Sequence, residues 1–150
     1  MDMAKRPSQA SGNPGKPPLM LKDEDFRTLA AVRSAIRGFA HFTEEVVEGA
    51  GLTRQQHQVL VSLCAAESSE LSIGELAETL MLRHHSVSGL ADRLESLGLV
   101  DRARSKGDRR VVVLRLTDKA RGLMSSLSQT HREELRRIRP LLVSLLSQLD

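Results

Sequence analysis

Apolar residues recur every three or four positions along much of the chain, which is the period of one face of a helix. Residues 23–48 carry this pattern and predict one long helix. A second helix is predicted after Thr53, whose hydroxyl can cap it. The residues of this second helix that are expected to face inward are Val59, Leu60, Leu63 and Cys64.

Two shorter helices are predicted next, joined by a tight turn. Ser72 and Glu75 have the spacing of a capping box, which opens a helix at its N-terminal end. After a turn around Met81–Arg83, the helical pattern returns from about His84 and ends before Gly98. The inward-facing residues of this helix are expected to be Val87, Leu90, Ala91 and Leu94. Two short helices in this arrangement predict a helix-turn-helix.

The period then changes to that of β-strands. Val111–Leu116 is rich in β-branched residues, and a basic turn at 104–110 separates it from Leu99–Val100. These segments predict a β-hairpin. A helix-turn-helix followed by a basic hairpin predicts a winged helix, whose second short helix enters the major groove of DNA. The predicted fold class is therefore mainly α (α+β).

The last stretch of the chain is again helical in pattern. Thr117 or Asp118 is expected to cap a long helix, and Pro140 is predicted to end or kink it because proline lacks an N–H. Beyond it, a last amphipathic helix is predicted from Leu141, Leu142, Leu145, Leu146 and Leu149. Together with residues 23–48, these leucines exceed what one small winged domain can cover, which favours a dimer. The alternative is that the terminal helices pack only on each other within one chain.

Charge and aromatic content narrow the class of partner. The formal net charge is only +3, but residues 83–121 hold ten basic residues against five acidic ones. This excess coincides with the helix-turn-helix and the hairpin, which favours duplex DNA. Three Phe and no Trp or Tyr disfavour proteins that stack single-stranded bases or sugars on aromatic rings.

The candidate DNA contacts lie on the outer face of the second short helix and in the hairpin. Imidazole, hydroxyl and cationic groups can bond to base edges and phosphates. Asp92 on the same helix would repel phosphates, so it is expected to pair with an arginine of that helix or of the hairpin. The candidate contacts are His84, His85, Ser86, Ser88, Arg93, Arg104, Lys106, Asp108, Arg109 and Arg110.

Three segments resemble the MarR family of winged-helix transcriptional regulators. They are Leu52–Leu60, Leu90–Val100, and Gly107–Arg110 followed by Leu114–Thr117. The family's hairpin signature is Asp-x-Arg-Arg. Asp108 and Arg110 match its first and third positions, whereas Val111 stands at the fourth, so only part of the signature carries over.

The resemblance implies an organisation as well as a function. It implies one MarR-like domain over residues 23–150, with dimerisation helices at 23–50 and 118–150 and a DNA-binding part at 53–117. The family's homodimers bind pseudo-palindromic operators and are often repressors that a small phenolic or lipophilic ligand releases. Arg37, His41 and His57 would border the family's ligand pocket, although each is equally explained as an ordinary surface or core side chain.

Residues 1–22 hold four of the five prolines and predict a flexible tail. The absence of an apolar run long enough for a membrane span or a secretory signal predicts a cytoplasmic protein without a membrane partner. Neither a cofactor nor a metal ion is expected.

Four rival functions compete with this interpretation. A metal sensor of the same fold is disfavoured because no two of the five histidines are spaced to share a helix face. A thiol sensor is disfavoured because the one cysteine, Cys64, lies in an apolar stretch with no cation beside it. An enzyme is disfavoured because nucleophile-elbow and phosphate-loop motifs are absent. A non-DNA interaction module would be recognised by a lack of salt-dependent duplex binding.

Overall fold

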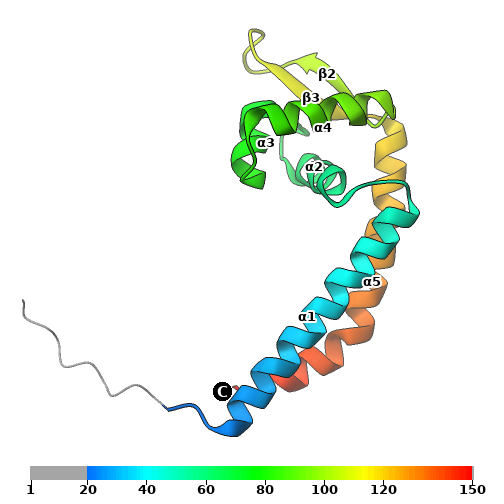
Figure 1. Ribbon diagram of the computed structural model, residues 1–150. Coiled ribbons are helices and arrows are strands. Elements are labelled where there is room, and N and C mark those ends of the chain that lie inside the picture. The colour runs from blue at the N-terminus through cyan, green and yellow to red at the C-terminus, as the bar shows by residue number, and fades with distance from the viewer. Residues whose placement is uncertain (1–19, 150) are drawn as a thin grey trace, which may run out of the picture.

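Two long helices and a small winged body make up the computed structural model, which describes residues 20–149 (Figure 1). The predicted tail lies outside the described residues up to position 19. The elements in chain order are α1 (Asp23–Gly49), α2 (Arg54–Ala65), β1 (Glu70–Ser72), α3 (Ile73–Leu80), α4 (His84–Ser96), β2 (Val100–Arg104), β3 (Val112–Leu116) and α5 (Asp118–Leu146). The structure confirms the expected fold class.

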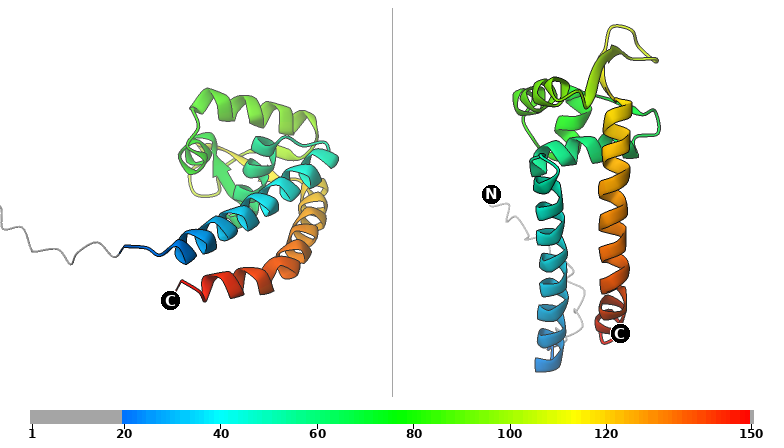
Figure 2. Two further views of the ribbon diagram at one scale, coloured as in Figure 1. Left: turned by 60° about the horizontal axis from the view of Figure 1, so that its bottom comes forward. Right: turned by 90° about the vertical axis from the view of Figure 1, so that its right-hand side faces the viewer.

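The long helices α1 and α5 run side by side in opposite directions (Figures 1 and 2). Near the far end of the pair, the Thr28 hydroxyl donates a hydrogen bond to Oε1 of Gln148 at 3.2 Å. Three acidic residues in the first turn of α1 suit the positive end of the helix dipole. The terminal helices therefore pack on each other within one chain.

α5 does not end at Pro140, and the separate last helix predicted beyond it is wrong. The helix continues through Pro140 to Leu146 (Figure 2 shows it changing direction toward its red end). Proline removes the hydrogen bond to the carbonyl of Arg136, four residues earlier. Because both residues are exposed, water can satisfy that carbonyl, and the helix bends instead of stopping.

The winged body is built around one apolar core. Local capping signals start its helices, because Thr53 accepts from Gln56 N–H at 3.2 Å and Ser72 accepts from Glu75 N–H at 3.1 Å. All four predicted inward residues of α4 are buried. Other core residues are Val59, Leu60 and Leu63 of α2, Leu76 of α3, Leu114 and Leu116 of β3, and Ala120, Met124 and Leu127 of α5.

Cys64 is not a core residue, so its predicted inward position is wrong. The cysteine is exposed on α2. Leu63 is buried, and the next residue of a helix points about 100° away from it. Cys64 therefore falls beyond the edge of the buried stripe.

The sheet has three strands in the order β1-β3-β2, all antiparallel. The hairpin β2–β3 confirms the predicted wing. β1 was not predicted, because its three residues carry no strand pattern of their own and it exists only by pairing with β3. In this register Glu70 lies opposite Arg115.

Candidate nucleic-acid interface

α4 presents its polar face to solvent and its apolar face to the core. The turn that leads into it passes through Met81 in the left-handed conformation, with φ of 55°. His84, His85 and Arg93 are exposed, and the hydroxyls at 86 and 88 belong to partly exposed residues. Among the described residues, no side chain caps the N-terminus of α4. Its first N–H groups are thus open to an anion such as a phosphate.

The acid on this face, Asp92, is paired with an arginine of the wing. Asp92 Oδ1 accepts from Nη2 of Arg102 at 2.6 Å, and Arg102 Nη1 lies 3.2 Å from Glu95 Oε1. The hydrogen bond that Arg102 donates to Asp92 raises the pKa of Arg102. The predicted pairing is confirmed, and its partner lies on β2 rather than on α4. Arg93 has no ion-pair partner within residues 20–149, which leaves its charge available.

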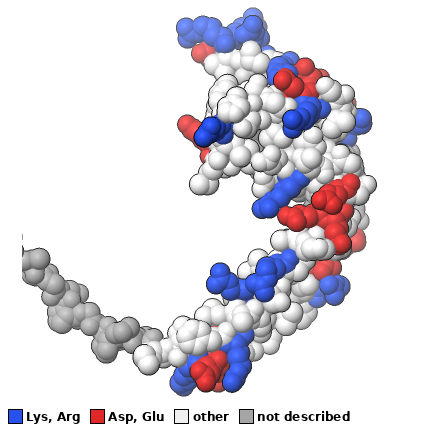
Figure 3. Space-filling view, viewed as in Figure 1, with Lys and Arg blue, Asp and Glu red and all other residues white. Residues whose placement is uncertain are grey.

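The wing gathers cationic side chains at its tip (Figure 3). Arg104, Lys106, Arg109 and Arg110 are all exposed. Asp108 Oδ1 accepts from the backbone N–H of Arg110 at 3.0 Å and from its Nε at 3.2 Å, and the backbone bond lowers the pKa of the carboxyl. Asp108 is therefore placed to shape the turn, while the Arg110 side chain stays 90% exposed.

One polar residue of this region, Glu70, was missed by sequence reasoning. It lies on β1 and is only 7% exposed. Its carboxylate accepts from Nε and Nη2 of Arg115 at 3.0 and 2.6 Å, and the bond from Arg115 is the main cause of its lowered pKa. No local motif marks Glu70, because its partners follow it by 35 residues or more.

The three residues suggested for a ligand pocket do not come together. His57 lines a groove of about 260 Å³ between α1 and α2, whose apolar wall includes Phe39 and Val47. His41 borders a different groove between α1 and α5 and lies with Nδ1 3.5 Å from Oε2 of Glu45. Arg37 is exposed and lines neither groove.

His57 instead meets a histidine of α5. Its ring lies edge-on to that of His131, with centroids 5.6 Å apart. Burial lowers the pKa of both imidazoles, and Nε2 of His131 is buried with no hydrogen-bond partner in the part of the chain that the structure describes. Within residues 20–149, no three His, Cys, Asp or Glu side chains gather as a metal site would require.

Cys64 bears on the thiol-sensor alternative. Its side chain is reachable from solvent, but desolvation raises the pKa of the thiol, and the charge of Arg121 offsets only part of this. A raised pKa means less thiolate, which is the form that reacts.

In the described part of the chain, no helix is both long and apolar enough to span a bilayer.

Comparison with known proteins agrees with this geometry. The model of the MarR family matches residues 50–111, which run from the end of α1 to the wing tip. The transcriptional regulator TtmR of Methylorubrum extorquens is 35% identical over 103 residues, covering 69% of this chain and 52% of TtmR. The chain belongs to the MarR family. The repressor MdtR of Bacillus subtilis is 39% identical over 74 residues, covering 49% of this chain and 46% of MdtR.

Solved structures of MarR-type proteins share the fold. AbsC, a MarR family regulator from Streptomyces coelicolor, superposes with a TM-score of 0.65 and is 26% identical, covering 87% of this chain and 90% of AbsC. A point mutant of MepR from S. aureus, solved bound to an oligodeoxyribonucleotide, gives a TM-score of 0.64 at 21% identity, covering 83% of this chain and 95% of MepR. This MarR-family chain spans about half the length of the two curated relatives, both of which are named as regulators rather than enzymes.

Proposed function

We propose that this MarR-family chain is a transcriptional repressor that binds duplex DNA through α4 and the wing. The observation that carries the proposal is the polar face of α4, whose Asp92 is paired with an arginine, beside the cationic wing tip. Arg102 pairs with Asp92, while Arg93 and Arg110 remain exposed to solvent. The names of MdtR as a repressor and of MepR as bound to an oligodeoxyribonucleotide support this assignment. Such a role agrees with the predicted cytoplasmic location.

The proposed binding unit is a homodimer. Large apolar side chains remain exposed on both long helices, among them Phe26 at 59%, Ile36 at 56%, Leu141 at 52% and Leu146 at 52%. A second copy would bury these side chains, since several large apolar residues left exposed on a helix pair usually meet a partner. A two-fold dimer requires a pseudo-palindromic operator whose half-sites are centred about 10–10.5 bp apart or a multiple of this.

The test is a footprint of the purified protein on genomic DNA, followed by affinity measurements over a range of salt concentrations. We expect protection of an inverted repeat and a log–log salt slope near −0.9 for each phosphate neutralised. A chain that binds duplex DNA without salt dependence, or does not bind it, would instead be a protein-interaction module.

A small phenolic or lipophilic effector is proposed for the groove between α1 and α2. Its apolar lining and the imidazole of His57 suit a ring that carries one hydrogen-bonding group. The effector would release DNA by favouring a conformation with a different spacing of the two α4 helices. A phenol panel tested for release of the footprinted duplex checks this, and Phe39→Ala should abolish any response while leaving DNA affinity unchanged.

A further inference from the structure

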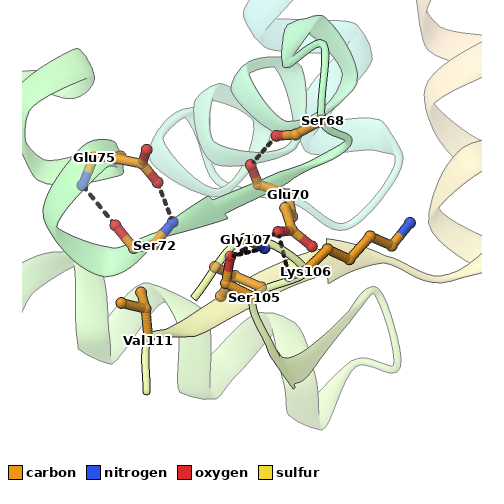
Figure 4. Close-up of a pocket in the computed structure, with 9 residues that line it drawn as sticks. Ser68, Glu70, Ser72, Glu75, Ser105, Lys106, Gly107 and Val111 are labelled. Atoms are coloured by element: carbon orange, nitrogen blue, oxygen red, sulfur yellow. Dashed lines mark hydrogen bonds between the residues drawn. The ribbon is translucent and has the colours of Figure 1, made fainter. Parts of the chain in front are cut away.

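We propose that Glu70 is a positioning residue that holds the wing in its DNA-binding orientation, although it belongs to neither α4 nor the wing. The inference rests on the proposed function and concerns how the same surface is organised. Glu70 lies on the edge strand β1, and the sheet order places β3 between it and the end of β2. Its carboxylate nevertheless reaches the first residues of the wing turn, Ser105 and Lys106 (Figure 4).

Both oxygens of the carboxylate are fully used. Oε1 accepts from the Ser105 hydroxyl at 3.0 Å and from the backbone N–H of Lys106 at 3.1 Å. Oε2 accepts the two bonds from Arg115. The Nη2 of Arg115 also donates to the carbonyl of Arg104 at 3.1 Å, so the end of β2 is held as well.

The Ser105 hydroxyl connects Glu70 to the backbone at the tip of the wing. While its proton points to Glu70, its oxygen accepts from the N–H of Gly107 at 3.2 Å and from that of Asp108 at 3.5 Å. The turn is closed further on, where Val111 N–H donates to the Asp108 carbonyl at 3.0 Å. Consecutive hydrogen bonds thus link Glu70 through Ser105 and Asp108 to the exposed Arg110, whose backbone N–H donates to Oδ1 of Asp108.

Charge alone predicts the opposite role for Glu70. A carboxylate beside the wing opposes the approach of phosphates, so its removal should strengthen DNA binding if electrostatics decides. If orientation decides, replacing Glu70 by Gln should weaken binding, because the single amide oxygen cannot accept both from Arg115 and from the wing turn at Ser105 and Lys106. The sign of the effect therefore separates the two roles.

Glu75 supplies a matched control. It lines the same groove as Glu70, and its Oε2 accepts from the backbone N–H of Ser72 at 2.7 Å as part of the α3 capping box. Glutamine can take the same place in a capping box. Glu75→Gln and Glu70→Gln thus remove the same charge from one groove, but only Glu70 contacts the wing.

The experiment compares the two variants with the parent on one footprinted duplex at several salt concentrations. We expect Glu70→Gln to weaken binding about fivefold to tenfold, with a smaller salt slope, while Glu75→Gln binds at least as tightly as the parent. Ser105→Ala should weaken binding comparably, and the double variant Glu70→Gln/Ser105→Ala should add little to either change. Glu70→Gln binding as tightly as Glu75→Gln would overturn the proposal.

A second readout separates positioning from general destabilisation. Amide hydrogen exchange of the free protein should quicken at Gly107 and Asp108 in Glu70→Gln, while the core amides of α2 and α4 keep their protection. Equal loss of protection in the core would overturn the proposal, and if Glu70→Gln does not fold, Ser105→Ala decides by the same measurements. A parent that binds no duplex would refute the proposed function, whereas the exchange comparison would still test the order that Glu70 imposes.

Discussion

The winged body and the long helices differ in how much of their apolar surface a single chain buries. In the body, α2, α3, α4 and β3 share one core of buried apolar residues, and the acids at 70 and 92 are paired with arginines. Its most exposed apolar side chain, Met81, lies in the turn before α4. Along α1 and α5, Phe26, Ile36 and Leu141 remain more than half exposed, even though the two helices pack on each other. The body is thus complete by itself, whereas the helix pair has apolar surface left for a partner.

The strongest test of this contrast removes the end of α5. Ending the chain at Arg139 deletes exposed Leu141 and Leu146 together with the Thr28–Gln148 contact, so we expect the dimer and operator binding to be lost. Light scattering after size exclusion measures the mass, with refractive-index detection because the chain has no Trp or Tyr. A stable dimer that binds DNA without residues 140–150 would contradict the role given to this segment.

Operator spacing tests the same contrast from the DNA side. Inserting about 5 bp at the centre of the footprinted site turns one half-site to the opposite face of the duplex. Affinity should then fall toward the non-specific level, a loss of about a thousandfold or more. Undiminished affinity, measured by gel shift at equal salt, would mean that the bodies bind as independent monomers.

A pair of leucine truncations sharpens the comparison within the chain. Leu76 is fully buried in the body, so Leu76→Ala should lower the free energy of unfolding by about 2–5 kcal/mol. Leu141→Ala, at an exposed site, should cost the isolated chain less than about 1 kcal/mol and act mainly on dimer affinity. Denaturation at low and high protein concentration separates the two effects. If both variants lose the same free energy of unfolding at low and high protein concentration, the end of α5 is stabilised within one chain as the body is.

Removing a single cation of the body should have a smaller effect on DNA binding. Arg110→Ala and Arg93→Ala each remove an exposed charge, so each should weaken duplex binding and reduce the magnitude of the salt slope by about 1. Circular dichroism should remain unchanged. If both variants bind like the parent, the orientation proposed for α4 and the wing is wrong.

The smallest predicted effect concerns the junction of the two regions. Burial lowers the pKa of His57 and His131 below 6.5 in the folded chain, so the unfolded chain takes up protons first as the pH falls. Stability should be constant with respect to these groups above their unfolded pKa and should decline below it. His131→Gln should flatten the decline, as measured by thermal unfolding from neutral to mildly acidic pH, while exposed His85→Gln should leave it in place.

Local signals made much of the fold predictable. Thr53, Ser72 and Gly98 mark helix ends by their own chemistry, and apolar spacing identified the core of α4 correctly. Features that depend on residues far apart in the sequence were not predicted. β1 forms only against β3, and Glu70 acquires its role from residues far along the chain. At Pro140 the helix bends, which is one of the two outcomes predicted there. The separate helix beyond it was wrong, because the solvent exposure that lets α5 continue is a property of the assembled structure.

The candidate site was predictable in composition but less so in arrangement. Sequence placed the exposed residues of α4 and the cations of the wing correctly on one part of the fold. It could not show that Asp92 pairs with β2, or that His41 and His57 border separate grooves. Whether the ten candidate contacts touch DNA stays a prediction.

The continuity of α5 gives the molecule a mechanical arm. The helix contributes Ala120, Met124 and Leu127 to the core of the body and carries its exposed leucines at the other end. Its 29 residues span about 43 Å at about 1.5 Å per residue. A tilt of about 5° at one end of such an arm moves the other end by about 4 Å, close to the rise of about 3.4 Å between successive base pairs. In a dimer, a change of a few degrees where α5 leaves the core would therefore shift α4 by a whole step along the operator.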